Sequence, residues 1–106
     1  MDRIRYIKVC GDFESTGLWD ETTYLQVYPD EINLPEHFVK RLDQLVKDYD
    51  PILPLDGDEL QAPPIQEKIR EIDARGTELT KELATFLGDK FSLRYYSEGL
   101  QKFIEI

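Results

Sequence analysis

The order of predicted elements indicates an α+β protein with two layers. Segments rich in β-branched and aromatic residues lie near both ends of the chain, at residues 3–10, 23–28, 91–96 and 100–106. Two amphipathic stretches lie between them. This β-β-α-α-β-β order predicts a single domain over residues 1–106, in which an antiparallel sheet of about four strands is covered by two helices. At 106 residues and 41% apolar content, the chain can form one hydrophobic core.

The first two predicted strands are separated by a long polar loop. Residues 3–10 alternate in part between apolar and polar side chains. The segment Thr23–Tyr28 has the β-branched and aromatic content of a second strand, which Pro29 ends. The intervening residues 11–22 are rich in turn formers and contain Trp19, the only tryptophan. We expect the two strands to pair in antiparallel fashion.

Two helices are predicted from the spacing of apolar residues. Residues 33–49 carry such a stripe, and Asp50-Pro51 ends it. From Ile65 to Phe86 apolar residues recur at alternating steps of four and three, which predicts a helix of about 23 residues that Gly88 terminates. Gly76 occupies one slot of this stripe. Either another backbone or a large side chain approaches closely there, or the helix breaks.

The two remaining connections have distinct compositions. Residues 51–64 contain four prolines, one glycine and three acids, which predicts a stiff, extended, acidic loop. Ser97-Glu98-Gly99 separates the last two strands and is typical of a hairpin turn.

Acidic residues are concentrated in two stretches that contain no Lys or Arg. Residues 9–39 hold seven acids and residues 48–67 hold six, in a chain whose net charge is −9. Such segregated charge favours encounter with a basic partner and opposes binding to nucleic acid, whose phosphates it repels.

Catalytic and metal-binding patterns are not evident. His37 is the only histidine and Cys10 the only cysteine, so a zinc site is not supported and no internal disulfide can form. The acidic run Asp56–Glu59 lacks the ligand spacing of a calcium loop. We therefore expect no enzyme activity, no metal and no cofactor. Without an apolar run of bilayer length or a signal-peptide pattern, we expect a cytoplasmic protein that does not enter membranes.

Trp19 and the long helix each allow two interpretations. Trp19 either folds back over the core or forms an exposed aromatic anchor in an acidic rim. The long helix either covers the sheet or forms a homodimer through its heptad-like stripe. Gly76 would weaken such a seam, which favours the cover.

Several local patterns resemble those of a known group of proteins. They are Ser15-Thr16-Gly17-Leu18-Trp19-Asp20 after the first strand, Leu34-Pro35 before a helix that ends in Tyr49-Asp50, and Leu87-Gly88-Asp89 before an aromatic strand. Together they are similar to small acidic bacterial proteins that include immunity proteins of polymorphic or contact-dependent toxin systems. The resemblance implies a cytoplasmic protein that binds another protein, with a cognate toxin as the partner.

The leading hypothesis is an inhibitor that covers the active site of a basic partner, such as a nuclease toxin. Carboxylates can occupy a cleft lined with Lys and Arg in place of phosphate. The candidate partner-binding residues are Asp12, Glu14, Trp19, Asp20 and Glu21 in the first acidic stretch, and Asp56, Asp58 and Glu59 in the second. The alternative is a structural or regulatory interaction module whose acids serve solubility.

Overall fold

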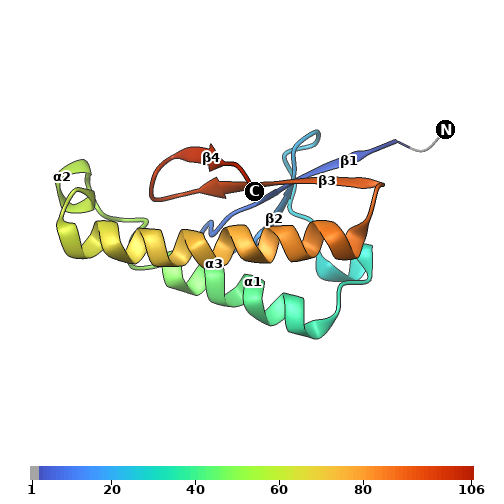
Figure 1. The fold of residues 1–106 in the computed structure, drawn as a ribbon, viewed down its shortest axis with the longest axis horizontal. Helices are drawn as coiled ribbons and strands as arrows, with labels where there is room; N and C mark the ends of the chain where they lie inside the picture. Colours follow the sequence, from blue (N-terminus) through green and yellow to red (C-terminus); the bar gives the residue numbers. More distant parts are fainter. Residues whose placement is uncertain (1–2) are drawn as a thin grey trace.

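Strands from the two ends of the chain form one four-stranded sheet (Figure 1). The computed structural model describes residues 3–106. The strands are β1 (Arg5–Val9), β2 (Leu18–Asp20), β3 (Phe91–Ser97) and β4 (Lys102–Ile104), in the spatial order β2-β1-β3-β4. The α+β class and the chain order of the main elements are confirmed, with two short helical segments added.

The sheet is mixed, so the prediction of an antiparallel sheet is wrong in one pairing. β1·β2 and β3·β4 are antiparallel, but β1 and β3 run parallel, from Arg5 opposite Phe91 to Val9 opposite Tyr95. The long helix α3 (Pro63–Leu87) returns the chain to the end of the sheet where β1 begins. There the Arg5 amide donates to the Lys90 carbonyl at 2.9 Å. Because β3 starts beside the start of β1, the two strands share a direction.

The second strand lies earlier in the chain than predicted. β2 is formed by Leu18–Asp20, and residues 23–28 lie antiparallel beside it with one isolated bridge, between Trp19 and Gln26. The Asp20 amide donates to the Leu25 carbonyl, and the Val27 amide donates to the Leu18 carbonyl, both at 2.9 Å. Tyr24 has φ 63°, outside the extended region, and this interrupts what would have been a regular strand.

A 3-10 turn, η1 (Pro29–Ile32), precedes the helix α1 (Glu36–Tyr49), which therefore starts later than residue 33. The acidic segment 51–64 is not wholly extended, because it contains the short helix α2 (Gly57–Leu60). α3 follows almost at once, and Gly88 with φ 80° ends it as predicted.

Within residues 3–106, none of the helices combines the length and apolar character needed to cross a bilayer.

The core lies between the sheet and the helices. α3 packs against β3 on one side and against α1 on the other, and both helices lie on the same side of the sheet (Figure 1). The fully buried members of this core include Ile7, Val9, Leu18, Leu42, Tyr49, Ile69, Leu83 and Tyr95. The apolar stripe of α3 is thus used within the chain, as the covering interpretation predicted.

One buried carboxylate joins three elements inside this core. Asp73 of α3 is 5% exposed. Its Oδ1 accepts hydrogen bonds from the hydroxyls of Tyr49 at 2.5 Å and Tyr95 at 2.7 Å, and its Oδ2 accepts one from Ser97 at 2.7 Å. The hydroxyls satisfy the buried carboxylate, which would otherwise be costly in an apolar interior. The network ties α1, α3 and β3 together.

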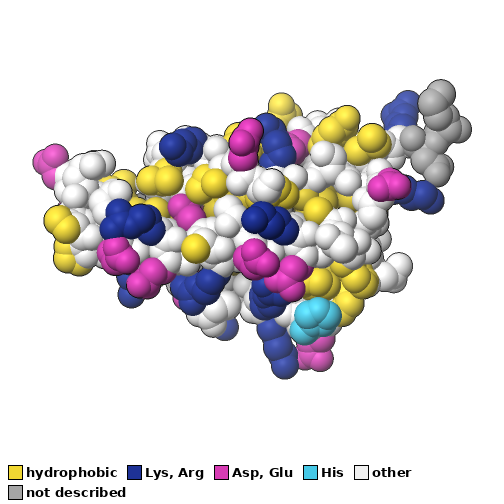
Figure 2. Space-filling model, in the orientation of Figure 1, with side chains coloured by type: hydrophobic (Ala, Val, Ile, Leu, Met, Phe, Trp, Pro, Cys, Tyr) yellow, Lys and Arg dark blue, Asp and Glu magenta, His cyan; other side chains and the backbone are white. Residues whose placement is uncertain are grey.

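Acidic and basic side chains alternate over α3 on the face shown in Figure 2. Ion pairs between α1 and α3 include Arg41–Glu82 at 2.6 Å and Arg75–Asp48 at 3.2 Å. This face therefore does not show the excess of acidic residues that the two acidic stretches give the sequence.

Candidate functional site

The sheet has one face that the helices do not cover, and its side chains are aromatic and charged. Because side chains alternate along a strand, the strands that bury Ile7 and Tyr95 on the inner face place their neighbours on the outer face. The outer positions are Tyr6 and Lys8 in β1, Trp19 in β2, Arg94 and Tyr96 in β3, and Phe103 in β4. Tyr6 and Phe103 are 48% and 41% exposed.

A hollow of about 530 Å³ lies on this open face. It is lined by Lys8, Asp12, Trp19, Asp20, Glu21, Tyr24, Arg94 and Phe103. The guanidinium of Arg94 is held on two sides, because its Nε donates to Glu21 at 3.2 Å and its Cζ lies 3.7 Å from the centroid of the Phe103 ring. Lys8 Nζ lies 5.2 Å from the centroid of the Tyr96 ring. Both cations are therefore positioned before any partner arrives.

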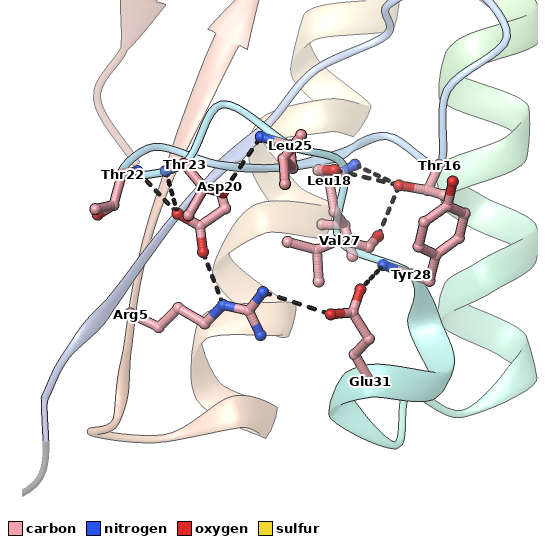
Figure 3. Close-up of polar contacts among 10 residues, drawn as sticks. All are labelled: Arg5, Thr16, Leu18, Asp20, Thr22, Thr23, Leu25, Val27, Tyr28 and Glu31. Carbon is pink, nitrogen blue, oxygen red and sulfur yellow. Dashed lines mark hydrogen bonds and ion pairs between the residues drawn. The ribbon is translucent and has the colours of Figure 1, made fainter.

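Asp20 organises the turn that borders the hollow (Figure 3). Its Oδ1 accepts hydrogen bonds from the backbone amides of Thr22 at 2.8 Å and Thr23 at 3.0 Å, and its Oδ2 accepts one from Nε of Arg5 at 2.9 Å. The Arg5 guanidinium, helped by the two amides, lowers the pKa of Asp20. This carboxylate, 7% exposed, is engaged within the fold and holds the turn in place.

Thr16 and Glu31 hold the rest of the segment 21–28 (Figure 3). The Thr16 hydroxyl donates to the Val27 carbonyl at 2.8 Å. Glu31 accepts from the Tyr28 amide at 2.6 Å and forms an ion pair with Arg5 at 3.7 Å. Polar contacts therefore fix the backbone of this segment, and Val27 is its one fully buried side chain.

The structure brings part of the predicted site together and separates the rest. Asp12, Trp19, Asp20 and Glu21 line the 530 Å³ hollow. Glu14 instead lines a separate hollow with Tyr28 and Asp43. Asp56, Asp58 and Glu59 lie at α2, which is at one end of the longest axis and away from β2 (Figure 1). The two acidic stretches therefore do not form one surface.

Two of the α2 acids have a structural role. Asp56 Oδ1 accepts from the Glu59 amide at 2.8 Å, and Glu59 Oε1 accepts from the Asp56 amide at 3.2 Å, which makes a capping box. Asp58 is exposed and takes no part in this box. A charge change at Asp58 therefore leaves the cap intact.

Trp19 belongs to a strand and not to the loop in which the sequence placed it. It lies half-buried on the outer face of the sheet, so it does not cover the core from the helical side. Its indole Nε1 is buried and has no hydrogen-bond partner among the described residues. Trp19 is part of the wall between the hollow and the segment 21–28.

The aromatic and basic residues that line this hollow, apart from Trp19, were not predicted from the sequence. Lys8, Arg94 and Phe103 come together because β1, β3 and β4 are neighbours, and the pairing of β1 with β3 is not visible in the sequence. Tyr24 was assigned to a strand. The sequence pattern that could have indicated a turn here is Asp20 followed by Thr22 and Thr23. An aspartate side chain often accepts hydrogen bonds from the backbone amides two or three residues later, and this arrangement is typical of a turn.

The fold and this open face define a small α+β protein with a hollow of charged and aromatic residues on the uncovered face of its sheet. A family model described as Serratia CdiI immunity protein-like matches residues 5–98. The chain therefore belongs to this family, as the resemblance in the sequence indicated. A comparison with curated proteins gives no match.

Proposed function

We propose that this chain is an immunity protein that binds a toxin and neutralises it in the cytoplasm. Membership of the immunity protein-like family over residues 5–98 carries this proposal. The open sheet face supports it, because Trp19, Arg94 and the surrounding aromatic residues are the types that dominate protein–protein binding energy. A binding role also agrees with the positioning of Arg94 and Lys8 by their aromatic neighbours.

The partner that we propose is a basic toxin, such as a nuclease, whose active site the inhibitor covers. Asp12 and Glu21 line the hollow, and Glu14, two residues after Asp12 in the chain, lines a separate hollow. Within residues 3–106 no ion pair engages Asp12 or Glu14. Carboxylates in this state can meet Lys and Arg side chains that otherwise bind phosphate, and they accelerate the encounter.

A second candidate is a self-associating interaction module, and one feature favours it. A hollow of about 270 Å³ lies between α1 and α3, with Leu45, Ile72 and Leu79 among its lining residues. Arg41 and Asp48 belong to the same lining. Sedimentation equilibrium across a range of protein concentrations tests this candidate directly, since a module that acts by self-association is dimeric at low micromolar concentration.

The test of the main proposal combines capture with a toxicity assay. Tagged protein is used to capture partners from the source lysate at low and at high salt, and each basic partner is then expressed alone and together with this chain. We expect one partner that salt releases, that stops growth when expressed alone, and that becomes harmless on co-expression. If no captured partner is toxic, or if co-expression gives no protection, the proposal is wrong.

Charge reversals decide which acidic stretch meets the toxin. We expect Asp12→Lys and Glu14→Lys together to slow association and to reduce its dependence on salt. Asp58→Lys tests the α2 end without removing the cap, whereas reversal of Asp56 or Glu59 would also disturb the helix. Glu71→Lys on the exposed side of α3 is the matched control. A stretch whose reversal leaves the association rate at the control value lies outside the interface.

A further inference from the structure

The two most exposed large apolar side chains among residues 3–106 are adjacent in the chain. Tyr24 is 81% exposed and Leu25 is 67% exposed, and Tyr28 in the same segment is 57% exposed. Single exposed apolar residues are common, but adjacent ones that project together are typical of a binding surface. This segment was not among the sites that the sequence indicated.

The backbone of this segment is fixed in a conformation that presents these side chains outward. Tyr24 has φ 63°, which is uncommon for a bulky residue. Its amide donates to the Asp20 carbonyl, and the Leu25 carbonyl accepts from the Asp20 amide, both at 2.9 Å. With the carboxylate bonds of Asp20 to Thr22 and Thr23, the turn is closed by hydrogen bonds on both sides. Strained backbone that its surroundings hold in place is found most often at functional positions.

Tyr24 also stands between two hollows. Together with Trp19, it lines the 530 Å³ hollow on the sheet face and a second hollow of about 460 Å³. The second hollow is completed by Leu25, Gln26, Tyr28 and Glu31. Tyr24 and Leu25 therefore form a projecting apolar ridge with a depression on each side. Such a ridge is complementary to a partner surface that has a pocket between two raised edges.

The charge around the ridge indicates the charge that is expected at the edges of the partner's pocket. Residues 9–39 contain no Lys or Arg, and their acids include Glu21 and Glu31 at the two hollows and Asp30 in η1. Three basic groups lie nearby, Arg5, Lys8 and Arg94, against five acids, Asp12, Asp20, Glu21, Asp30 and Glu31, so the surface around the ridge keeps a net negative charge. A partner with basic edges is therefore favoured, and an acidic one is disfavoured.

We infer that Tyr24 and Leu25 are the apolar anchors of the interface, and that they enter an apolar pocket edged by Lys and Arg on the toxin. This inference rests on the proposed function and adds the residues that make the central contact. Because the turn is already closed by hydrogen bonds, little order has to be gained on binding, which strengthens the contact. Asp12 at the sheet-face hollow and Asp30 in η1, which no ion pair engages among residues 3–106, then pair with the basic edges of the pocket.

The test uses an inactive, purified form of the toxin that the co-expression experiment identifies. It measures the dissociation constant of the complex between this toxin and each variant of the chain. Tyr24→Asn removes the ring but suits the positive φ, since Asn tolerates the left-handed region. Its thermal unfolding midpoint should therefore equal or exceed that of the native chain. We expect binding at least 30-fold weaker for Tyr24→Asn and a similar loss for Leu25→Ser. Leu100→Ser is the matched control, because Leu100 is 41% exposed on the turn between β3 and β4.

Each other outcome has a distinct meaning. If the native chain protects against the toxin and Tyr24→Asn binds it with unchanged affinity, the anchor is wrong and the proposed function stands. If Leu100→Ser weakens binding as much as Leu25→Ser, the effect is not local and the anchor is again wrong. If no toxin is neutralised, the proposed function fails and the anchor fails with it. A native dimer that Tyr24→Asn dissociates would make a second copy the occupant and would overturn the inference.

Discussion

The aromatic ring of Tyr95 lies directly against the backbone of Gly76, so that a Cβ at residue 76 would be 2.3 Å from Cε1 of the ring. The ring cannot move aside easily, because it is fully buried and its hydroxyl is bonded to Asp73. The sequence left two explanations for Gly76: the close approach of another backbone or a large side chain, or a break in the helix. The helix is continuous through this position, and the close approach is to a large side chain.

We expect Gly76→Ala to lower the free energy of unfolding by about 2 kcal/mol. Overpacking a core costs about 1–3 kcal/mol, and we take the upper end because the ring is so close and cannot move aside; the gain of about 1 kcal/mol in helix propensity offsets part of that cost. Chemical denaturation measures the change. Gly57→Ala in α2 is the control, because a Cβ there meets nothing within 4 Å and stability should stay within about 0.5 kcal/mol. An equally stable Gly76→Ala would contradict the close contact.

Replacement of Asp73 by Asn should destabilise the fold by about 2–4 kcal/mol, because one amide group cannot accept all three hydroxyl donors. The donors are Tyr49 and Tyr95 at one oxygen and Ser97 at the other, and the amide nitrogen must face one of these two groups. Urea unfolding followed by tryptophan fluorescence measures the loss. Asp43→Asn on the exposed side of α1 is the control and should change stability little. Equal stability for the two variants would show that the network is not needed.

The helices and the last hairpin were predictable from the sequence because their signals are local. The stripe that begins at Ile65 located α3 within about two residues of its start, and Gly88 located its end. Ser97-Glu98-Gly99 placed the turn between β3 and β4. These signals depend on spacing and turn chemistry, which a single sequence contains.

The sheet order and the buried polar network were not predictable in the same way. The parallel pairing of β1 and β3 depends on where α3 delivers the chain, which is a property of the assembled fold. Asp73 follows the stripe residue Ile72 and looks like an ordinary solvent-facing acid until Tyr49 and Tyr95 are seen beside it. Among the residues that line the hollow, Trp19 and Glu21 were named from the sequence, whereas Arg94, which donates to Glu21, was not.

Stability should fall at alkaline pH because of the two buried tyrosines. Burial, assisted by the charge of Asp73, raises the pKa of both Tyr49 and Tyr95. The unfolded chain therefore releases these protons near pH 10, while the folded chain keeps them. Their contribution is complete below about pH 10 and declines above it by about 1.4 kcal/mol per pH unit for each tyrosine.

Urea unfolding between pH 8 and pH 11.5 checks this dependence. Tyr49→Phe removes one of the two groups, so its stability should fall more slowly above pH 10 than that of the native chain. Its stability at pH 8 should already be lower, because the bond to Asp73 is lost. A native chain whose stability is the same at pH 8 and pH 11 would rule out the linkage.

Cys10 should be unreactive in the folded protein. Its side chain is fully buried, and burial raises its pKa to about 12, with the nearby Glu98 carboxylate adding to the effect. The thiolate is the reactive form, so at pH 8 a disulfide reagent should label Cys10 only when the chain unfolds. Labelling with and without urea measures this. Asp58→Cys in a Cys10→Ala background supplies an exposed thiol, which should react at once in the native state. Comparable native rates for the two thiols would contradict the burial of Cys10.

Asp20→Asn should loosen the turn that presents Tyr24 and should lower stability by about 1–3 kcal/mol, since it weakens hydrogen bonds made to a charged group. The pKa of Asp20 is lowered in the folded state, first by its bond to Arg5. Its contribution is therefore complete above about pH 4 and is lost as the pH falls through the lowered value. The stability difference between the native chain and Asp20→Asn should shrink from pH 6 to pH 2.

Hydrogen exchange locates the effect of Asp20→Asn in the chain. The amides of Thr22 and Thr23 donate to the Asp20 carboxylate, so they should exchange faster in the variant, while those of α3 change only with global stability. Asp58→Asn is the control, because Asp58 is exposed and outside the capping box. If Thr22 and Thr23 keep their protection in Asp20→Asn, another contact holds the turn. Tyr24 would then owe its position to the pairing of residues 25–27 with β2, because those backbone bonds do not involve the carboxylate.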